Sequence, residues 1–199
     1  SAIWGVMTDK GSAMVIADWY SRNGLYLRDR DYAKSANHRP YGPDLRSSSG
    51  NPGTIINDDG AFKIPNNPAI PNHPTAAEIL ANPGVNRFDF NPWISAMGET
   101  KRYGAMAVAN YNITEKLTAS MEASARRINY KVSAAPTPVF GDLDGFVVGA
   151  ANPYNPFGED VAFRYRITEA GPRLSDGETD AMRFLPGLKL SLGEDWTVE

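Results

Sequence analysis

The sequence predicts an all-β fold: an antiparallel meander of long hairpins from a large transmembrane β-barrel, with long extracellular loops and one short loop helix. Three observations predict it. Apolar and polar residues alternate along several segments, which places them on opposite faces of a strand. Aromatic residues lie at the ends of these segments on the apolar face, as in the girdles that mark the two surfaces of a bilayer. Short polar turns at one end of the strands contrast with long connections at the other.

The clearest hairpin is predicted over residues 102–112 and 117–130, and we expect both segments to cross the membrane. Asn112–Lys116 supplies a short polar turn between them. Glu122 and Arg126 lie on the polar face of the second strand, where they would line an aqueous interior. The apolar face is formed by alternate residues, namely Tyr103, Ala105, Ala107, Ala109, Tyr111, Leu117, Ala119, Met121, Ala123 and Ala125.

Strands are also predicted before this hairpin, over residues 1–8 and 11–21. In the second of these, Val15 and Trp19 belong to an apolar series and Asp18 lies on the polar face. Asn23-Gly24 suits the positive φ angles of a tight turn, so residues 25–32 are expected to form the return strand.

The C-terminal part repeats the pattern over residues 180–192, with Leu188 and Leu190 on the apolar side and Lys189 opposite. Gly193-Glu194-Asp195 is expected to turn the chain into a last strand, 196–199, which opens with Trp196. About seven crossings cannot close a barrel with long polar loops, so we expect the chain to be a segment of a larger protein.

The turns set the direction of the predicted strands. If 22–24, 112–116 and 193–195 all lie on the periplasmic side, residues 12–21 run toward that side. Two long stretches rich in Pro, Gly and Asn then become extracellular excursions, 33–100 and 131–179.

Two local features are predicted within the excursions. Thr75-Ala76-Ala77-Glu78 is a capping box that begins a helix of about two turns, and Pro83-Gly84 ends it. Val161–Thr168 is another alternating run, which we expect to pair with residues near 179–184 as a hairpin beyond the bilayer.

Composition excludes several classes of protein. The 199 residues contain no cysteine, which excludes disulfides and thiolate metal sites. A net charge of −3 and a pI near 5.5 argue against a nucleic-acid partner. No apolar run reaches the roughly 20 residues of a membrane helix. The mean hydropathy of −0.40 remains compatible with barrel strands, because these alternate apolar and polar residues.

The excursions supply the candidate ligand contacts. Arg164 and Arg166 share one face of an alternating run, where they would form an electropositive rim that attracts anionic substrates. The alternative is a solvated face paired with local carboxylates such as Glu159 and Asp160.

Aromatic and amide residues in the excursions form a second group of candidates. They would stack on and hydrogen-bond to a sugar or a chelate, and loop packing is the alternative. The group comprises Trp93, Tyr154 and Asn155, together with Tyr41 and Asn152.

No catalytic or metal site is predicted, and no cofactor is expected. His38 and His73 lie in Pro-rich loops without a carboxylate at ligand spacing, and Ser47-Ser48-Ser49 lacks the context of a nucleophile elbow. Two acidic turns, 57–60 and 142–145, lack the further ligands and distal Glu of a calcium loop, so ordinary turn chemistry is expected there.

Several motifs, in this order, resemble those of TonB-dependent outer-membrane receptors. They are Arg28-Asp29-Arg30, the run from Arg46 to Thr54, Lys101-Arg102-Tyr103-Gly104, the run from Asn152 to Val161, Arg164-Tyr165-Arg166, Gly171-Pro172-Arg173, and Trp196 after its turn. The resemblance spans nearly the whole chain. It implies a 22-stranded barrel, an N-terminal plug domain and a TonB box, of which the plug and the box are not in this sequence. Ligand contacts are not fixed by motif in that family, so the resemblance assigns none here.

Three functions are therefore weighed. The first is a barrel segment of a Gram-negative outer-membrane transporter that imports a siderophore, vitamin or oligosaccharide with TonB-coupled energy. Its expected partners are outer-membrane lipid, TonB through the plug, the ligand and a possible surface lipoprotein or other subunits. The second is a secreted β-sandwich that binds carbohydrate, in which a second sheet would cover Leu117 and its apolar neighbours. A hydrolase, the third, would need His38 or His73 beside a carboxylate and a nucleophile.

Overall fold

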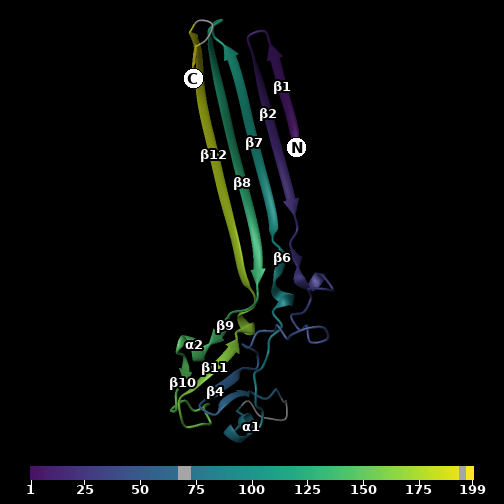
Figure 1. Cartoon of the computed structure of the whole chain (residues 1–199), viewed down its shortest axis with the longest axis vertical. Coiled ribbons are helices and arrows are strands. Elements are labelled where there is room, and N and C mark those ends of the chain that lie inside the picture. Colours follow the sequence, from purple (N-terminus) through teal and green to yellow (C-terminus); the bar gives the residue numbers. More distant parts are fainter. Residues whose placement is uncertain (67–72, 193–195) are drawn as a thin grey trace. The chain divides into compact units, whose positions relative to one another are not determined.

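The computed structural model describes residues 1–66, 73–192 and 196–199. Strands account for 54% of the described residues and pair antiparallel, which confirms the all-β prediction. The chain divides into two compact units (Figure 1). Unit 1 comprises Ser1–Gly24, Gly98–Val132 and Ser175–Glu199, and unit 2 comprises Leu25–Met97 and Ser133–Leu174.

Unit 1 is one six-stranded sheet whose order is β1-β2-β7-β8-β12-β13 (Figure 1). Its described residues form a single layer, because they contribute no helix and no second sheet. The strands are β1 (Ala2–Thr8), β2 (Gly11–Arg22), β7 (Glu99–Asn112), β8 (Leu117–Ala134), β12 (Arg173–Leu192) and β13 (Trp196–Val198).

Two tight turns lie at the same end of this sheet. Asp9 and Lys10 join β1 to β2, whose last pair is Thr8 with Gly11. The predicted turn between β7 and β8 is confirmed, because Asn112 pairs with Thr118 and the Ile113 amide donates to the Leu117 carbonyl at 2.8 Å. The predicted turn at 193–195 lies outside the described residues, although β13 does pair with β12.

The prediction of a return strand over 25–32 is wrong. Residues Leu25–Tyr26 form the short strand β3, which pairs with β6 (Ser95–Met97), and Leu27–Asp29 form a 3-10 helix. The reason is non-local pairing: β7 occupies the edge of β2 along its whole length, from Gly11 opposite Tyr111 to Arg22 opposite Thr100.

The predicted direction of the first strands is therefore also wrong. Asn23-Gly24 is not a hairpin turn, and β2 runs away from the tight turns instead of toward them. The first excursion begins at Leu25, not at residue 33. The second excursion is shorter than the predicted 131–179, because the strands on either side of it are long: β8 has 18 residues and ends at Ala134, and β12 has 20 residues and begins at Arg173.

Unit 2 is built on a small sheet ordered β10-β11-β4-β5, with β9 also paired to β11. Its core consists of Ile55, Ile79 and Val161, with Phe62, Ile64, Val148, Phe157 and Phe163 packed around them. The strands are β4 (Thr54–Asn57), β5 (Gly60–Lys63), β9 (Pro138–Phe140), β10 (Val147–Val148) and β11 (Val161–Arg166).

This pairing contradicts the hairpin predicted between Val161–Thr168 and residues near 179–184. The run does form a strand, β11, but its neighbours are β4, β9 and β10. Residues 179–184 belong to β12 in the other sheet, where β8 is the neighbour. Val161 is almost fully buried in the unit 2 core. This burial explains why β11 pairs within unit 2 and not with the long strands of unit 1.

The helices of unit 2 are short. The predicted capping box forms as expected: the Glu78 amide donates to Thr75 Oγ1 at 3.3 Å at the start of α1 (Ala76–Leu80). The second helix is α2 (Gly141–Asp144), and 3-10 turns cover Asn91–Trp93 and Thr168–Ala170. In the part of the chain that the structure describes, no helix has the length and apolar character needed to cross a membrane.

Candidate functional site

One face of the unit 1 sheet is apolar across four strands. The register aligns Val15 with Ala107 and Ala107 with Ala123, so small apolar side chains form continuous rows. Trp4 extends the same row onto β1, where it faces Val15. The predicted alternation therefore produces one apolar surface, which we call the apolar face.

Large side chains on the apolar face are exposed. Trp4 is 65% exposed, Trp19 68%, Phe184 64% and Leu188 62%. Val15 and Leu190 are also exposed, at 43% and 39%. A sandwich would bury these side chains beneath a second layer, and the described residues of unit 1 contain no such layer.

Aromatic residues bound the apolar face at two levels. Trp19 is paired with Tyr103 at the end from which the chain leaves the sheet. Tyr111 lies near the tight turns, and Trp196 is paired with Leu192 at the same end. Between the two levels lie the rows of Ala and Val described above.

From the Trp19–Tyr103 level outward, away from the tight turns, the same side of the sheet becomes charged. Arg127 is paired with Tyr103 in the register, and its guanidinium donates to both oxygens of Asp180 at 2.7 Å. Glu178 lies 3.5 Å from Arg127, and Lys101 lies 3.1 Å from Glu99. The chemistry of this side therefore changes abruptly within one or two residues of the aromatic level.

The opposite side of the sheet, the polar face, carries most of the predicted interior residues. Asp18 pairs with Gly104 and Gly104 with Arg126, and a Cβ at Gly104 would collide with the Asp18 carboxylate. Glu122 lies 3.2 Å from Arg183 on β12. Lys189 belongs to β12 as predicted.

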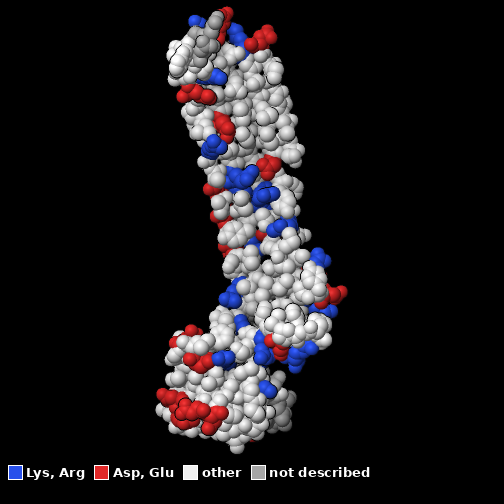
Figure 2. Space-filling view, in the orientation of Figure 1, with Lys and Arg blue, Asp and Glu red and all other residues white. Residues whose placement is uncertain are grey.

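Arginine is the commonest charge on the polar face. Arg102 lies over the Tyr20 ring at 4.5 Å, and Arg22 donates to the Gly98 carbonyl at 3.0 Å. Figure 2 shows Lys and Arg side chains over the middle part of the sheet, with Asp and Glu side chains among them. The polar face also carries apolar residues toward its tight turns, among them Ile16 and Met106, which are paired with each other.

Arg164, one of the predicted ligand contacts, is used within unit 2. Its guanidinium donates to the two oxygens of Asp142 at 2.9 and 2.5 Å and to Ser48 Oγ at 3.0 Å. The hydrogen bonds from Arg164 lower the pKa of Asp142, so this pair stays ionised at neutral pH. The alternative of ion pairing is the one that this geometry favours, although the carboxylate is Asp142 and not Glu159 or Asp160.

Arg166 is buried, with only 4% of its surface exposed. It donates to the Pro136 carbonyl at 2.7 Å, to Ser47 Oγ at 2.7 Å and to the Ser49 carbonyl at 3.3 Å, and it lies over the Phe88 ring. Burial lowers the pKa of Arg166, and the cation of Arg173 adds to this effect. The side chain ties three segments of unit 2 together.

The aromatic and amide candidates fall into two sets. Tyr154, Asn152 and Asn155 line one cavity of unit 2, whereas Trp93 and Tyr41 are not among the described residues that line it. The Asn155 amide donates to three carbonyls, those of Val148, Gly149 and Glu159, so its donors are used in shaping its own loop. Trp93 is half-buried and stacks near Phe88, with 6.4 Å between the ring centroids. These contacts correspond to loop packing, and a ligand role for either residue stays a prediction.

Tyr154 is exposed and stacks on His73, with ring centroids 4.8 Å apart. Both residues line a largely apolar cavity of about 520 Å³ beside the unit 2 core, which also involves Ile79 and Phe157. Asn152 and Asn155, from the same group of candidates, also line this cavity. Residues 67–72, which precede His73 in the sequence, lie outside the described residues.

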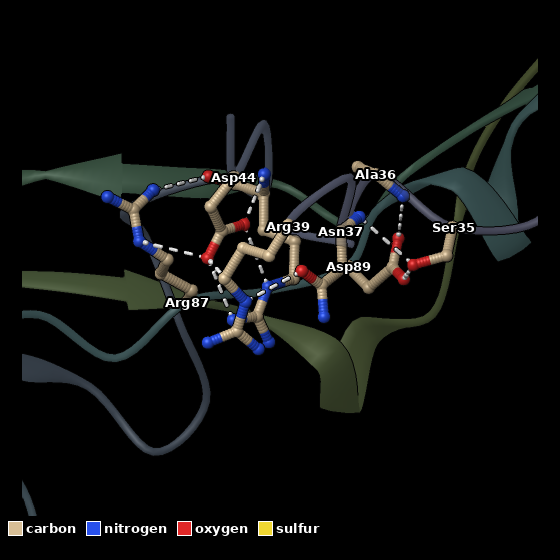
Figure 3. Close-up of polar contacts among 8 residues, drawn as sticks. Ser35, Ala36, Asn37, Arg39, Asp44, Arg87 and Asp89 are labelled. Atoms are coloured by element: carbon tan, nitrogen blue, oxygen red, sulfur yellow. Dashed lines mark hydrogen bonds and ion pairs between the residues drawn. The ribbon is translucent and has the colours of Figure 1, made fainter. Parts of the chain in front are cut away.

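Sequence reasoning missed a cluster of arginines around Asp44, which we call the Asp44 cluster (Figure 3). The Asp44 carboxylate accepts from Arg46 at 2.9 and 3.0 Å, and it lies 3.6 Å from Arg87 Nε and 3.8 Å from Arg39 Nε. The hydrogen bonds from Arg46 hold the pKa of Asp44 well below its usual range, with Arg87 adding to the effect.

A second carboxylate, Asp89, shapes the loop beside the Asp44 cluster. It accepts hydrogen bonds from Ser35 Oγ at 2.5 Å and from the Ala36 amide at 3.0 Å (Figure 3), and from the Asn91 amide at 3.3 Å. No sequence motif marks the cluster, because Arg87 is about 40 residues from Asp44. The fold brings the two segments together, through the bridge between Ser47 and Phe88 and the hydrogen bond from Arg87 Nη1 to the Arg46 carbonyl.

Catalytic and metal-binding geometry is not found in the described ranges. Neither imidazole there donates to or accepts from a carboxylate, since His38 lies near Tyr41 and His73 stacks on Tyr154. No three acidic or histidine side chains converge as metal ligands within residues 1–66, 73–192 and 196–199.

Comparison of the chain with known protein families, curated proteins and solved structures finds no match.

Proposed function

We propose that unit 1 is part of the wall of an outer-membrane β-barrel, with its apolar face against lipid and its polar face toward a water-filled interior. One observation carries the proposal: a single-layer sheet exposes a broad apolar face bounded at both ends by aromatic residues. Each exposed Leu or Phe would gain about 1.5–3 kcal/mol on leaving water. An apolar surface of this kind marks an interaction site in soluble proteins and the lipid contact in barrels.

The height of the apolar face agrees with a bilayer. On β12 the apolar series runs from Met182 to Leu192, which are ten residues apart. At about 3.3 Å per residue this is about 33 Å along the strand, and a tilt of about 40° reduces it to about 25 Å. That is the height of the apolar band in outer-membrane barrels.

The charged zone beyond Trp19 supports the same placement. Crossing the membrane takes about 10 residues, so roughly half of β12 and β8 remains for a region outside the bilayer. The ion pairs of Arg127 and Lys101 begin where that region would start. Charged side chains in contact with headgroups and water carry little of the cost that they would have in hydrocarbon.

We further propose that the whole protein imports a scarce nutrient such as a siderophore, a vitamin or an oligosaccharide, and that no covalent catalysis is involved. The resemblance to TonB-dependent receptors and the two long insertions of unit 2 support this. Energy would come from TonB acting on a plug domain outside this chain. Unit 2 would face the external medium, where a surface lipoprotein or other subunits have access to it.

The alternative, a secreted β-sandwich that binds carbohydrate, requires a second sheet over the apolar face. The described residues of unit 1 supply no second sheet, and Leu188 remains 62% exposed. Membrane insertion therefore accounts for the apolar face with fewer additional elements.

The proposal is tested by the depths of the tryptophans in vesicles containing brominated lipids. The variants keep one Trp each, and Phe replaces the others. Trp4 lies in the middle row beside Val15, so lipids brominated near the chain ends should quench it most. Trp19 and Trp196 should be quenched most by lipids brominated near the headgroup, and Trp93 of unit 2 should be hardly quenched. Equal, weak quenching of all four would rule out the membrane wall.

A further inference from the structure

The Asp44 cluster has an unusual charge balance. Three guanidinium groups, those of Arg39, Arg46 and Arg87, lie within 4 Å of one carboxylate. They leave a surplus of two positive charges around Asp44. Asp89 offsets part of this surplus, but its oxygens are already engaged by Ser35, Ala36 and Asn91.

The arginines of the cluster have hydrogen-bond donors to spare. Among the described residues, Arg39 uses only Nε, which donates to Asn37 at 2.8 Å, and Arg46 leaves Nη1 without an acceptor. Arg87 donates through Nη1 to the Arg46 carbonyl and leaves Nη2 without an acceptor. Several N–H groups of the three arginines therefore have no acceptor among the described residues.

The other well-formed arginine pair of unit 2 is different. Arg164 meets one carboxylate, Asp142, in a two-pronged contact, and its remaining nitrogen donates to Ser48. Its charge is balanced one to one. A purely structural role explains the Arg164–Asp142 pair, but the same role would need only Arg46 beside Asp44.

The exposure of the side chains leaves the cluster accessible. The Asp44 side chain is only 15% exposed, whereas that of Arg39 is 61% and that of Arg87 is 37% exposed. The carboxylate thus lies beneath its arginines and holds them together. Spaced guanidinium forks of this kind match the oxygens of phosphate or carboxylate groups.

We propose that the Asp44 cluster binds a doubly charged oxyanion of the phosphate type, carried by a small soluble ligand. A dianion would neutralise the two surplus charges and accept from the free N–H groups of Arg39, Arg46 and Arg87. The identification of this anion as part of the imported nutrient rests on the proposed transport function, whereas the binding site itself does not.

The polar face of unit 1 shows the same sign of charge independently. Arg22, Arg102 and Arg126 lie on successive rows toward the end from which the chain leaves the sheet, and Asp18 is the acidic residue among them. An interior lined in this way favours the passage of an anion over that of a cation.

The test is titration of the whole protein, in zwitterionic detergent at pH 7, with inorganic phosphate by calorimetry. We expect saturable binding of one phosphate per chain. Arg39→Gln should weaken it at least about tenfold, because hydrogen bonds to a charged group are lost. Lys63→Gln removes the same charge from β5 of the same unit and should change the affinity less than about twofold, because exposed charges are screened.

Arg39 is suited to the test because its exposed side chain contributes little to packing, and unchanged thermal unfolding of Arg39→Gln checks this. Absence of saturable binding, or equal losses in the two variants, would overturn the proposal. A second titration uses mixed micelles that contain phosphatidic acid and no free phosphate. Binding only in these micelles would identify a lipid headgroup and overturn the soluble ligand.

The two proposals fail separately. If phosphate does not bind but the tryptophans lie at the expected depths, the proposed anion site is refuted and the proposed membrane wall stands. If phosphate binds but Trp4 and Trp19 are not quenched, the proposed anion site stands and the proposed membrane wall is refuted.

Discussion

Placing an arginine in the middle of the apolar face is a sharp test of lipid contact. Ala107 lies four residues from Tyr103 and four from Tyr111, and it pairs with Ala123. At about 3.4 Å per residue and a tilt of about 40°, this row lies about 10 Å from each aromatic level. Ala123 is thus at the predicted midplane of the bilayer.

The expected cost of Ala123→Arg is about 2–4 kcal/mol of folding free energy, the range for Arg at the midplane of a barrel. Ser124→Arg adds the same side chain one residue later, on the polar face, and should cost less than about 1 kcal/mol. Ala119→Arg stays on the apolar face but pairs with Tyr111 at the aromatic level, where the cost should fall to about 0–1 kcal/mol.

The assay is equilibrium urea unfolding of the membrane-inserted protein in phosphatidylcholine vesicles, followed by tryptophan fluorescence. We expect both a difference in cost between the two faces and a decline in cost with distance from the midplane. Equal costs for Ala123→Arg and Ser124→Arg would refute the assignment of the faces. A cost for Ala119→Arg as large as that for Ala123→Arg would refute the depth scale.

Three further predictions concern unit 2 and the charged end of the sheet. The pKa of Asp44 is lowered in the folded protein, so its stabilising contribution is present above its unfolded pKa of about 3.9 and is lost as the pH falls toward the folded value. Unfolding of unit 2, followed by Trp93 fluorescence from pH 7 to pH 3, should show this loss of stability. The Asp44→Asn variant should show a smaller loss over the same pH range. Arg166→Met leaves two buried carbonyls without their donor and should destabilise unit 2 by about 2–4 kcal/mol in urea unfolding, whereas exposed Arg39→Gln should change stability by less than about 0.5 kcal/mol. Gly177→Ala places a Cβ 2.5 Å from the Tyr130 ring and should cost about 1–3 kcal/mol, and an unchanged unfolding midpoint would show that the ring does not pack there.

The long strands could be predicted from the sequence because their signal is local. Alternation over 102–112, 117–130 and 180–192 depends only on neighbouring residues, and the turn after Asn112 has its own polar composition. The two faces follow directly, since a period of two fixes which residues share a side.

The partner of β2 could not be predicted in the same way. A local rule favours a hairpin at Asn23-Gly24, but β2 pairs with β7, about 80 to 100 residues away along the chain. The competing turn at Asp9-Lys10 has a weaker sequence signal, although it fixes the direction of β1 and β2. Pairing between distant segments is decided by the whole sheet, which explains this error.

The predicted site residues differ from those found in the structure for a related reason. Arg164 and Arg166 stand out in the sequence as an alternating pair, yet the structure gives each its own acceptors inside unit 2. Arg39, Arg46 and Arg87 carry no common motif, and only the fold brings them to Asp44. A charge in a motif is therefore a weaker guide to binding than a charge surplus in space.

The most direct measurement of the central claim is a spin-label scan of residues 119–126 on β8 in lipid vesicles. The chain has no cysteine, so single cysteines provide unique labelling sites. Oxygen, which concentrates in lipid, should collide most with labels at 119, 121, 123 and 125, and a water-soluble nickel complex should reach these labels least. A profile without this period of two, or odd-numbered labels that neither collider reaches, would contradict the account, since the apolar face would then lie beneath protein.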